Sequence, residues 1–254
     1  MASPVNAVSR YFSDRPDAEY ACPTCKKGLL TPRQETFTKI EPSYSEAEHH
    51  REDWEPDWIR YRFTFTCVCS RKECGETAYV SGSGSVDRRY VEDDESEWYD
   101  YFRIRAFYPA PVLCSIPDKV SEKVASLLEN SFSLYWVDVS AAANALRASL
   151  ENLLDELQIP RTEKKAKGTT FRISLHRRLE LWSKKQEEYA ELCFALKEVG
   201  NLGSHGESVH DKHYFAALEI YGHVLAQLYE NDAERMKELA KKIRSELKGL
   251  LGPL

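Results

Sequence analysis

The sequence predicts an α+β protein with a β-rich N-terminal domain and an all-α C-terminal domain. Three observations predict this class. Five of the seven cysteines lie in the first 75 residues, apolar side chains of that half alternate with a period of two, and the apolar period becomes helical after Cys114. We expect the two domains to comprise residues 1–115 and 116–254.

The composition excludes several classes of protein. The 254 residues are 42% hydrophobic and 30% charged, which is typical of a folded chain and not of a disordered tail. No apolar run approaches the roughly 20 residues that cross a bilayer, and the N-terminus lacks the apolar segment of a secretion signal. We therefore expect a cytoplasmic protein without membrane contact. The net charge of -6 argues against a protein that coats nucleic acid non-specifically.

Short alternating stretches predict the strands of the N-terminal domain. Between Tyr61 and Cys69 an aromatic ring or a thiol recurs at every second position, which is the period of a half-buried strand. The same alternation extends from Phe102 to Tyr108. Further strands are expected at residues 36–40 and 77–80, a turn at the glycine-serine segment 81–85, and exposed acidic loops at 41–57 and 92–100.

The N-terminal cysteines have the spacing of metal ligands. Cys22 and Cys25 form one pair, and Cys69 and Cys74 form a second pair on another tight turn. Two such turns that face each other complete a tetrahedral thiolate shell, which zinc favours in structural sites. Cys67 is an alternative to Cys69, and unligated buried thiols are the alternative to a metal site. Because four thiolates leave no position for water, this zinc-ribbon-like site would stabilise the domain without catalysing a reaction.

Helical periodicity predicts the C-terminal domain. Asp138 or Ser140 is available as a helix N-cap, Pro160 ends the same helix, and Gly200 is expected to end another. Arg147 and Glu151 have the i, i+4 spacing of a salt bridge. The apolar stripes extend over residues 143–157, 189–199, 215–228 and 236–247, with shorter helices expected at 118–131 and 173–182.

Several segments together resemble a known family. They are Cys22 to Cys25, Cys69 to Ser85, Phe107 to Pro117, Ala141 to Glu151, Leu175 to Leu179 and Ala195 to His205. They resemble the bacterial family of domain of unknown function 4145, over most of the chain. The resemblance implies that the helical part is HEPN-like, a group of helical nucleotide-binding domains that includes many ribonucleases of toxin and antiphage systems. It therefore implies a role in bacterial defence or RNA-level stress response.

The resemblance also implies candidate catalytic residues. Active HEPN ribonucleases carry an arginine, a polar residue, three further residues and a histidine, and cleave RNA without metal across a dimer. Asn201 matches the polar position and His205 the histidine, whereas Gly200 stands at the arginine position and Lys197 is the nearest cation. His205 is then the general acid or base, Asn201 orients the substrate, and Lys197 holds its phosphate. Alternatively, Asn201 and His205 hydrogen-bond free carbonyls at a helix end.

A basic segment favours contact with nucleic acid. Residues 161–185 contain nine lysines and arginines and two glutamates, a local net charge of +7, and such clustering is what phosphate contact requires. A solvated loop and helix face would have the same composition. The candidate nucleic-acid-binding residues are Lys164, Lys165, Lys167, Arg172, Arg177 and Arg178.

Two functions remain open from the sequence. The first is a nucleic-acid-associated protein of bacterial defence or stress response, acting as a homodimeric, metal-independent endoribonuclease alongside defence-system partner proteins. The second is a non-catalytic, zinc-stabilised binding or scaffold protein, in which the Asn201 and His205 segment has a structural role.

Overall fold

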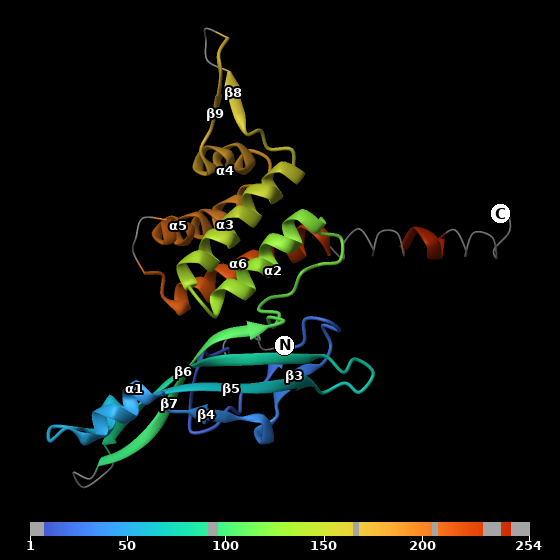
Figure 1. Cartoon of the computed structure of the whole chain (residues 1–254). Helices are drawn as coiled ribbons and strands as arrows, with labels where there is room; N and C mark the ends of the chain where they lie inside the picture. Colours follow the sequence, from blue (N-terminus) through green and yellow to red (C-terminus); the bar gives the residue numbers. More distant parts are fainter. Residues whose placement is uncertain (1–7, 91–95, 165–167, 205–207, 231–239, 245–254) are drawn as a thin grey trace.

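A seven-stranded antiparallel sheet in the N-terminal half is followed by helices (Figure 1). The mixed α+β class that the sequence predicts is therefore confirmed. Within the described residues, no helix is long and apolar enough to cross a bilayer. The computed structural model describes residues 8–90, 96–164, 168–204, 208–230 and 240–244.

Three long strands form the centre of the sheet. β5 (Arg60–Cys69) pairs with β6 (Thr77–Tyr90), which pairs with β7 (Ser96–Tyr108). The alternation correctly predicts β5 and β7, and the apolar residues of β5 face inward as expected. In β7 the expected inward face holds only for Phe102 and Ile104. The register then shifts opposite Ser81 and Gly82, which turns Phe107 inward and leaves Ala106 and Tyr108 exposed. Four short strands extend the sheet: β1 (Tyr11–Ser13) pairs with β7, β3 (Leu29–Pro32) and β4 (Thr38–Ile40) pair with β5, and β2 (Tyr20–Ala21) pairs with β3.

β6 continues through residues 81–85, where the sequence predicts a turn. That prediction is wrong, because these glycines do not form a turn but allow aromatic rings to pack closely against the strand. A Cβ atom at Gly82 would lie 2.6 Å from Cζ of Phe63, and one at Gly84 would lie 2.5 Å from Cδ1 of Phe102. Both glycines thus leave room for buried aromatic rings beneath a continuous strand.

The two acidic segments contain more regular structure than the expected loops. β7 begins within the second segment. In the first segment, the Ser45 hydroxyl donates to Glu41 at 2.6 Å and accepts from the backbone N–H of Arg60 at 3.0 Å, which anchors a helical turn against the sheet. The helical segments here are α1 (Ser43–Glu46) and the 3-10 turns Ala47–His50 and Pro56–Trp58, with a further 3-10 turn at Gln34–Thr36.

The C-terminal half contains the predicted helical bundle. The Asp138 carboxylate accepts hydrogen bonds from the backbone N–H groups of Ser140 and Ala141, as expected of an N-cap. A small hairpin that the sequence did not predict projects from the bundle (Figure 1). Most of the helix expected at residues 236–247 lies outside the described residues. The elements are α2 (Glu122–Tyr135), α3 (Val139–Glu156), β8 (Thr162–Lys164), β9 (Thr170–Arg172), α4 (Leu175–Ser183), α5 (Glu187–Ser204) and α6 (Asp211–Tyr229).

Gly200 lies inside α5 and does not end it. The expected helix end is therefore wrong, because α5 continues to Ser204. A Cβ atom at Gly200 would lie 2.8 Å from Cβ and 3.0 Å from Cδ of Arg147 on α3. The glycine is explained by this close approach of a neighbouring helix, which outweighs its low helix propensity.

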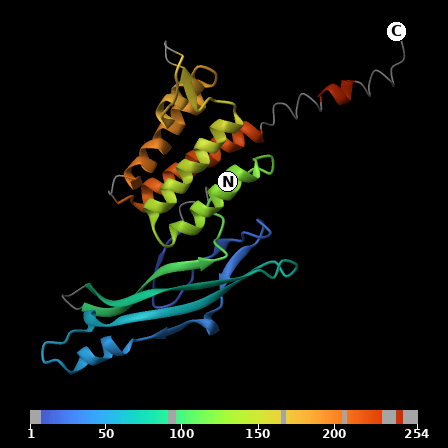
Figure 2. The ribbon, with the colours of Figure 1, turned by 45° about the horizontal axis from the view of Figure 1, so that its top comes forward.

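Aromatic and ionic contacts join the sheet to the bundle. The ring of Trp136 lies 5.5 Å from that of Tyr20 and 4.9 Å from that of Phe107, measured between centroids. Arg10, which is only 5% exposed, donates to both carboxylate oxygens of Asp211 at 2.6 and 3.2 Å. Beyond these contacts, β5 to β7 extend past the bundle toward α1, as both views show (Figure 2).

Candidate functional site

The structure brings together the four cysteines that the sequence selects. The Sγ atoms of Cys22, Cys25, Cys69 and Cys74 all lie within 4.8 Å of one another. Cys22 and Cys74 are 3.8 Å apart, and Cys25 and Cys69 are 3.7 Å apart. Four thiolates bound to zinc at about 2.3 Å would be separated by about 3.8 Å. The cluster could hold a metal ion, and its geometry and donors are compatible with zinc.

Backbone geometry explains why these thiols converge. Lys26 adopts a left-handed conformation with φ of 52° and donates its N–H to the carbonyl of Cys22 at 3.0 Å, which closes the first turn. Gly75 has φ of 61° and closes the second turn. The pairing of β3 with β5 places the turns side by side. A Cβ atom at Gly28 would lie 2.6 Å from Sγ of Cys69, so only glycine fits against this thiol.

The thiols differ in their readiness to ionise. A hydrogen bond from the backbone N–H of Lys27 lowers the pKa of Cys25 to about 6, whereas burial raises the pKa of Cys22 to about 12. A bound metal cation would favour the thiolate form at every position. Cys67 is not part of the cluster; it is fully buried in the sheet core, and burial raises its pKa to about 12.

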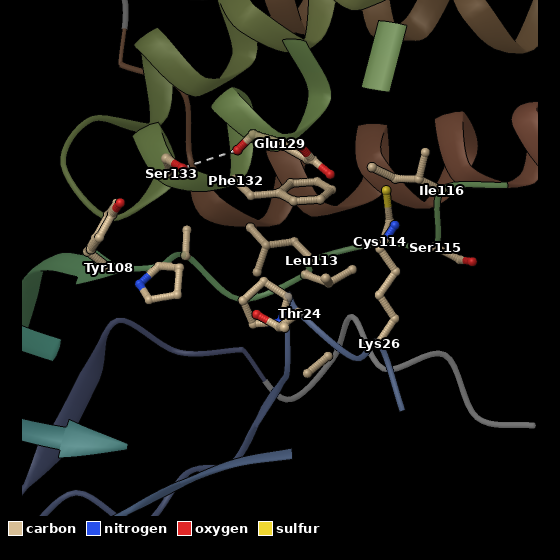
Figure 3. Close-up of a pocket in the computed structure, with 15 residues that line it drawn as sticks. Thr24, Lys26, Tyr108, Leu113, Cys114, Ser115, Ile116, Glu129, Phe132 and Ser133 are labelled. Atoms are coloured by element: carbon tan, nitrogen blue, oxygen red, sulfur yellow. Dashed lines mark hydrogen bonds between the residues drawn. The ribbon is translucent and has the colours of Figure 1, made fainter. Parts of the chain in front are cut away.

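Near the cluster, an apolar cavity of about 470 Å³ separates the first cysteine turn from α2 (Figure 3). Leu113, Ile116 and Phe132 supply much of its lining, and Lys26 and Glu129 are the charged residues that border it. This lining suits an apolar group better than a phosphate.

The motif residue Asn201 is held by an arginine that sequence reasoning did not connect to it. Nη1 of Arg147 donates to Oδ1 of Asn201 at 2.8 Å, and its Nε lies 3.6 Å from Glu151. The expected i, i+4 salt bridge is thus present, but Arg147 also reaches α5. The absence of a side chain at Gly200 is the one sequence signal for this contact.

Of the other two predicted catalytic residues, the structure describes Lys197 but not His205. Nζ of Lys197 lies 3.9 Å from Glu198 and 5.8 Å from the ring centroid of Phe194, and its side chain is 15% exposed. His205 lies outside the described residues, as do Lys165 and Lys167 of the basic segment. The structure therefore describes Asn201 and Lys197 on one helix without their histidine.

Much of the positive charge of the basic segment is neutralised by carboxylates. Arg177 pairs with Glu163 and Glu180, while Arg178, 3% exposed, pairs with Asp155 at 2.8 Å. Lys164 and Arg172 remain exposed on the hairpin of β8 and β9, although Arg172 lies 3.7 Å from Glu151.

A cavity of about 410 Å³ lies between the basic segment and α3. Arg147, Arg161, Arg172 and Arg178 line it, with Glu151 as the acidic lining residue. Asn201 does not itself line the cavity, and Arg147, which donates to Asn201, is the residue that links the motif to it. All four arginines are also ion-paired with Glu151 or Asp155, so a phosphate-sized anion would share their guanidinium donors with these carboxylates.

Two family models match the chain. Residues 10–127 match a domain of unknown function (DUF8608), and these residues include the cysteine cluster. No curated protein and no solved structure matches the chain. The resemblance drawn from the sequence had included the cysteine pairs, which fall instead in the DUF8608 match. Residues 129–246 match the domain of unknown function DUF4145, which confirms the resemblance for the helical half of the chain.

Proposed function

We propose that the protein is a nucleic-acid-associated protein of bacterial defence or stress response that binds RNA at the arginine-lined cavity of its helical half. The observation that carries this proposal is the position of Arg147, which lines the cavity and donates to Asn201. The match to DUF4145 supports the resemblance from which the defence role is inferred. The hairpin adds exposed positive charge beside the cavity, and the cysteine cluster would hold a structural zinc.

The catalytic form of the proposal is metal-independent RNA cleavage. The 2′-hydroxyl attacks the adjacent phosphorus, and the bond to the 5′-oxygen breaks, which leaves a 2′,3′-cyclic phosphate and a free 5′-hydroxyl. One His205 imidazole accepts the proton of the 2′-hydroxyl, and a second donates a proton to the leaving oxygen. A two-fold dimer would supply both histidines. Asn201 orients the phosphate, and Arg147 joins Lys197 as a cation for its charge.

The decisive experiment incubates end-labelled RNA with purified protein in excess chelator. His205→Ala removes the general base and the general acid together, so the cleavage rate should fall by about 100-fold or more. His223→Ala is the matched control, because His223 is an exposed histidine on a different helix. Cleavage that persists in His205→Ala, or that requires added metal, would reject the catalytic form.

The second candidate function is a non-catalytic binding or scaffold protein. It is favoured by the hydrogen bond of Asn201 to Arg147 and by glycine at the family's arginine position, because both suit a structural link between α3 and α5. RNA binding without cleavage, together with a lowered melting temperature of Asn201→Ala, would support this function.

A further inference from the structure

The outer face of the sheet, opposite its aromatic core, carries a second concentration of arginines. Arg60 and Arg62 project from β5, and Arg103 and Arg105 project from β7. In the part of the chain that the structure describes, no ion pair joins any of the four to a carboxylate. This contrasts with the basic segment, where Arg161, Arg177 and Arg178 are paired.

Strand register places three of these arginines in two rows across four strands, whereas Arg105 lies at the register shift between β6 and β7 and belongs to neither row. Because neighbouring strands lie about 4.8 Å apart, residues on β5 and β7 stand about 10 Å apart across β6. Small serines occupy β6 between the larger side chains, which hollows the centre of each row. The first row is Tyr11, Arg103, Ser83 and Arg62, and the second is Ser13, Tyr101, Ser85 and Arg60.

Hydrogen bonds within the described residues leave the four guanidinium groups without a carboxylate partner. Nε of Arg103 is buried and has no hydrogen-bond partner among the described residues. Burial and the adjacent charge of Arg103 lower the pKa of Arg105. The guanidinium of Arg60 donates to the backbone carbonyls of Asp57 and Ile59, and neither contact neutralises its charge.

Two tyrosines lie beside the arginines. The rings of Tyr11 and Tyr101 stack with a centroid distance of 5.5 Å and an interplanar angle of 14°, and the guanidinium of Arg103 lies 5.7 Å from the Tyr11 centroid. These residues border an open groove of about 630 Å³ whose floor is the serine and glycine stretch of β6. Asp57 and Asp87 are the carboxylate residues that line the groove.

We propose that this groove binds single-stranded nucleic acid. Guanidinium groups bind phosphate oxygens through paired donors, and tyrosine rings stack on bases that are not enclosed in a duplex. Alternation of cations and aromatic rings on a shallow sheet therefore suits a single strand better than a duplex, which hides the faces of its bases. The inference rests on the proposed function for its class of ligand, but it assigns a different surface, in the half of the chain that matches DUF8608.

Binding of a fluorescent single-stranded oligonucleotide, measured by anisotropy over a series of salt concentrations, tests this assignment. Replacing Arg62 and Arg103 together by glutamine should weaken binding at least about tenfold and reduce the salt slope by about 1.4, the value for two lost contacts with a single strand. Tyr101→Leu should weaken binding about 5- to 150-fold, because a stacked base is lost. The matched control replaces Lys119 and Lys123, both exposed before or at the start of α2, by glutamine and should leave binding within about twofold of wild type.

Separate arms distinguish the possible ligands and sites. RNA and DNA strands of one sequence identify the sugar, and their duplexes should bind more weakly. Equal competition by heparin together with unchanged binding by Tyr101→Leu would overturn the proposal, since it would indicate general attraction of polyanions. If Arg147→Gln abolishes binding and the sheet variants do not, the sheet site is rejected and the proposed function is retained. Absence of binding to every oligonucleotide would reject both. Unchanged circular dichroism of each variant verifies that it is folded.

Discussion

The guanidinium of Arg147 on α3 donates a 2.8 Å hydrogen bond to the amide oxygen of Asn201 on α5, and its side chain lies against Gly200. Active HEPN ribonucleases, which the helical half resembles, have an arginine at the position of Gly200. In this chain a cation reaches the neighbouring Asn201 from another helix. The contact is possible only because residue 200 has no side chain.

Gly200→Ala should destabilise the protein although alanine favours helices. The new methyl group would overlap the side chain of Arg147, and overpacking of this kind costs about 1 to 3 kcal/mol, against a gain in helix propensity of about 1 kcal/mol. Thermal denaturation should show a lower melting temperature, with weaker RNA binding if Arg147 is displaced from the cavity.

Gly222→Ala is the matched control for this prediction. Gly222 also lies inside a helix, but a Cβ atom there would be 3.6 Å from the nearest atom, Cβ of Cys114, which is an ordinary contact. This substitution should therefore raise stability by up to about 1 kcal/mol. Equal effects of the two substitutions would contradict the explanation based on Arg147.

Purified protein should contain one zinc ion per chain. Cys22→Ser should lose this zinc and lower the stability of the sheet, because binding energy at such a site is folding energy. Cys67→Ala should keep its zinc, since Cys67 lies outside the cluster, although the cavity that it leaves should lower the melting temperature. Elemental analysis measures the zinc content of the wild type and of both variants. Wild-type protein without zinc would refute the assignment.

Acid should weaken the contact of Asp155 with two arginines. Hydrogen bonding to Arg161 and then the charge of Arg178 lower the pKa of Asp155. Because the folded pKa lies below the unfolded value of about 3.9, ionised Asp155 stabilises the fold above about pH 4, and this stability is lost as the pH falls through the folded pKa. Asp155→Asn should cost roughly 3 kcal/mol at neutral pH, since it leaves buried Arg178 without its carboxylate.

Melting temperatures from pH 7 to pH 3 test this dependence. Wild type should lose stability more steeply than Asp155→Asn below about pH 4, so the two curves should converge. Asp53→Asn is the control, because the pair of Asp53 with Arg51 is exposed and contributes little. Parallel curves for wild type and Asp155→Asn would show that the contact does not control acid stability.

Charge reversal of Lys164, Lys165 and Lys167 tests the hairpin segment. If these lysines contact phosphate, replacing all three by glutamate should lower RNA affinity and flatten the salt slope by about 2 to 3 units. The control is again the variant in which Lys119 and Lys123 are replaced by glutamine. Unchanged affinity and salt slope would show that these lysines are solvated and do not contact RNA.

The sequence by itself determined the features that depend on local spacing. Alternation between Tyr61 and Cys69 predicted β5, and the Asp138 side chain predicted the start of α3, because strand period and helix capping involve residues close together in the chain. The two cysteine pairs predicted the cluster, since each pair is a local turn. Cys67 and Cys69 could not be separated in this way, because both point to the same side of one strand.

Only the tertiary structure decided what the glycines and arginines do. Gly84 and Gly200 resemble turn or helix-end residues in the sequence, but each accommodates a side chain from a distant segment. The link between Arg147 and Asn201 spans 54 positions, and the arginine rows of the sheet depend on the register of β5, β6 and β7. Such relationships leave no local pattern, because they arise only when packing brings separate elements within contact distance.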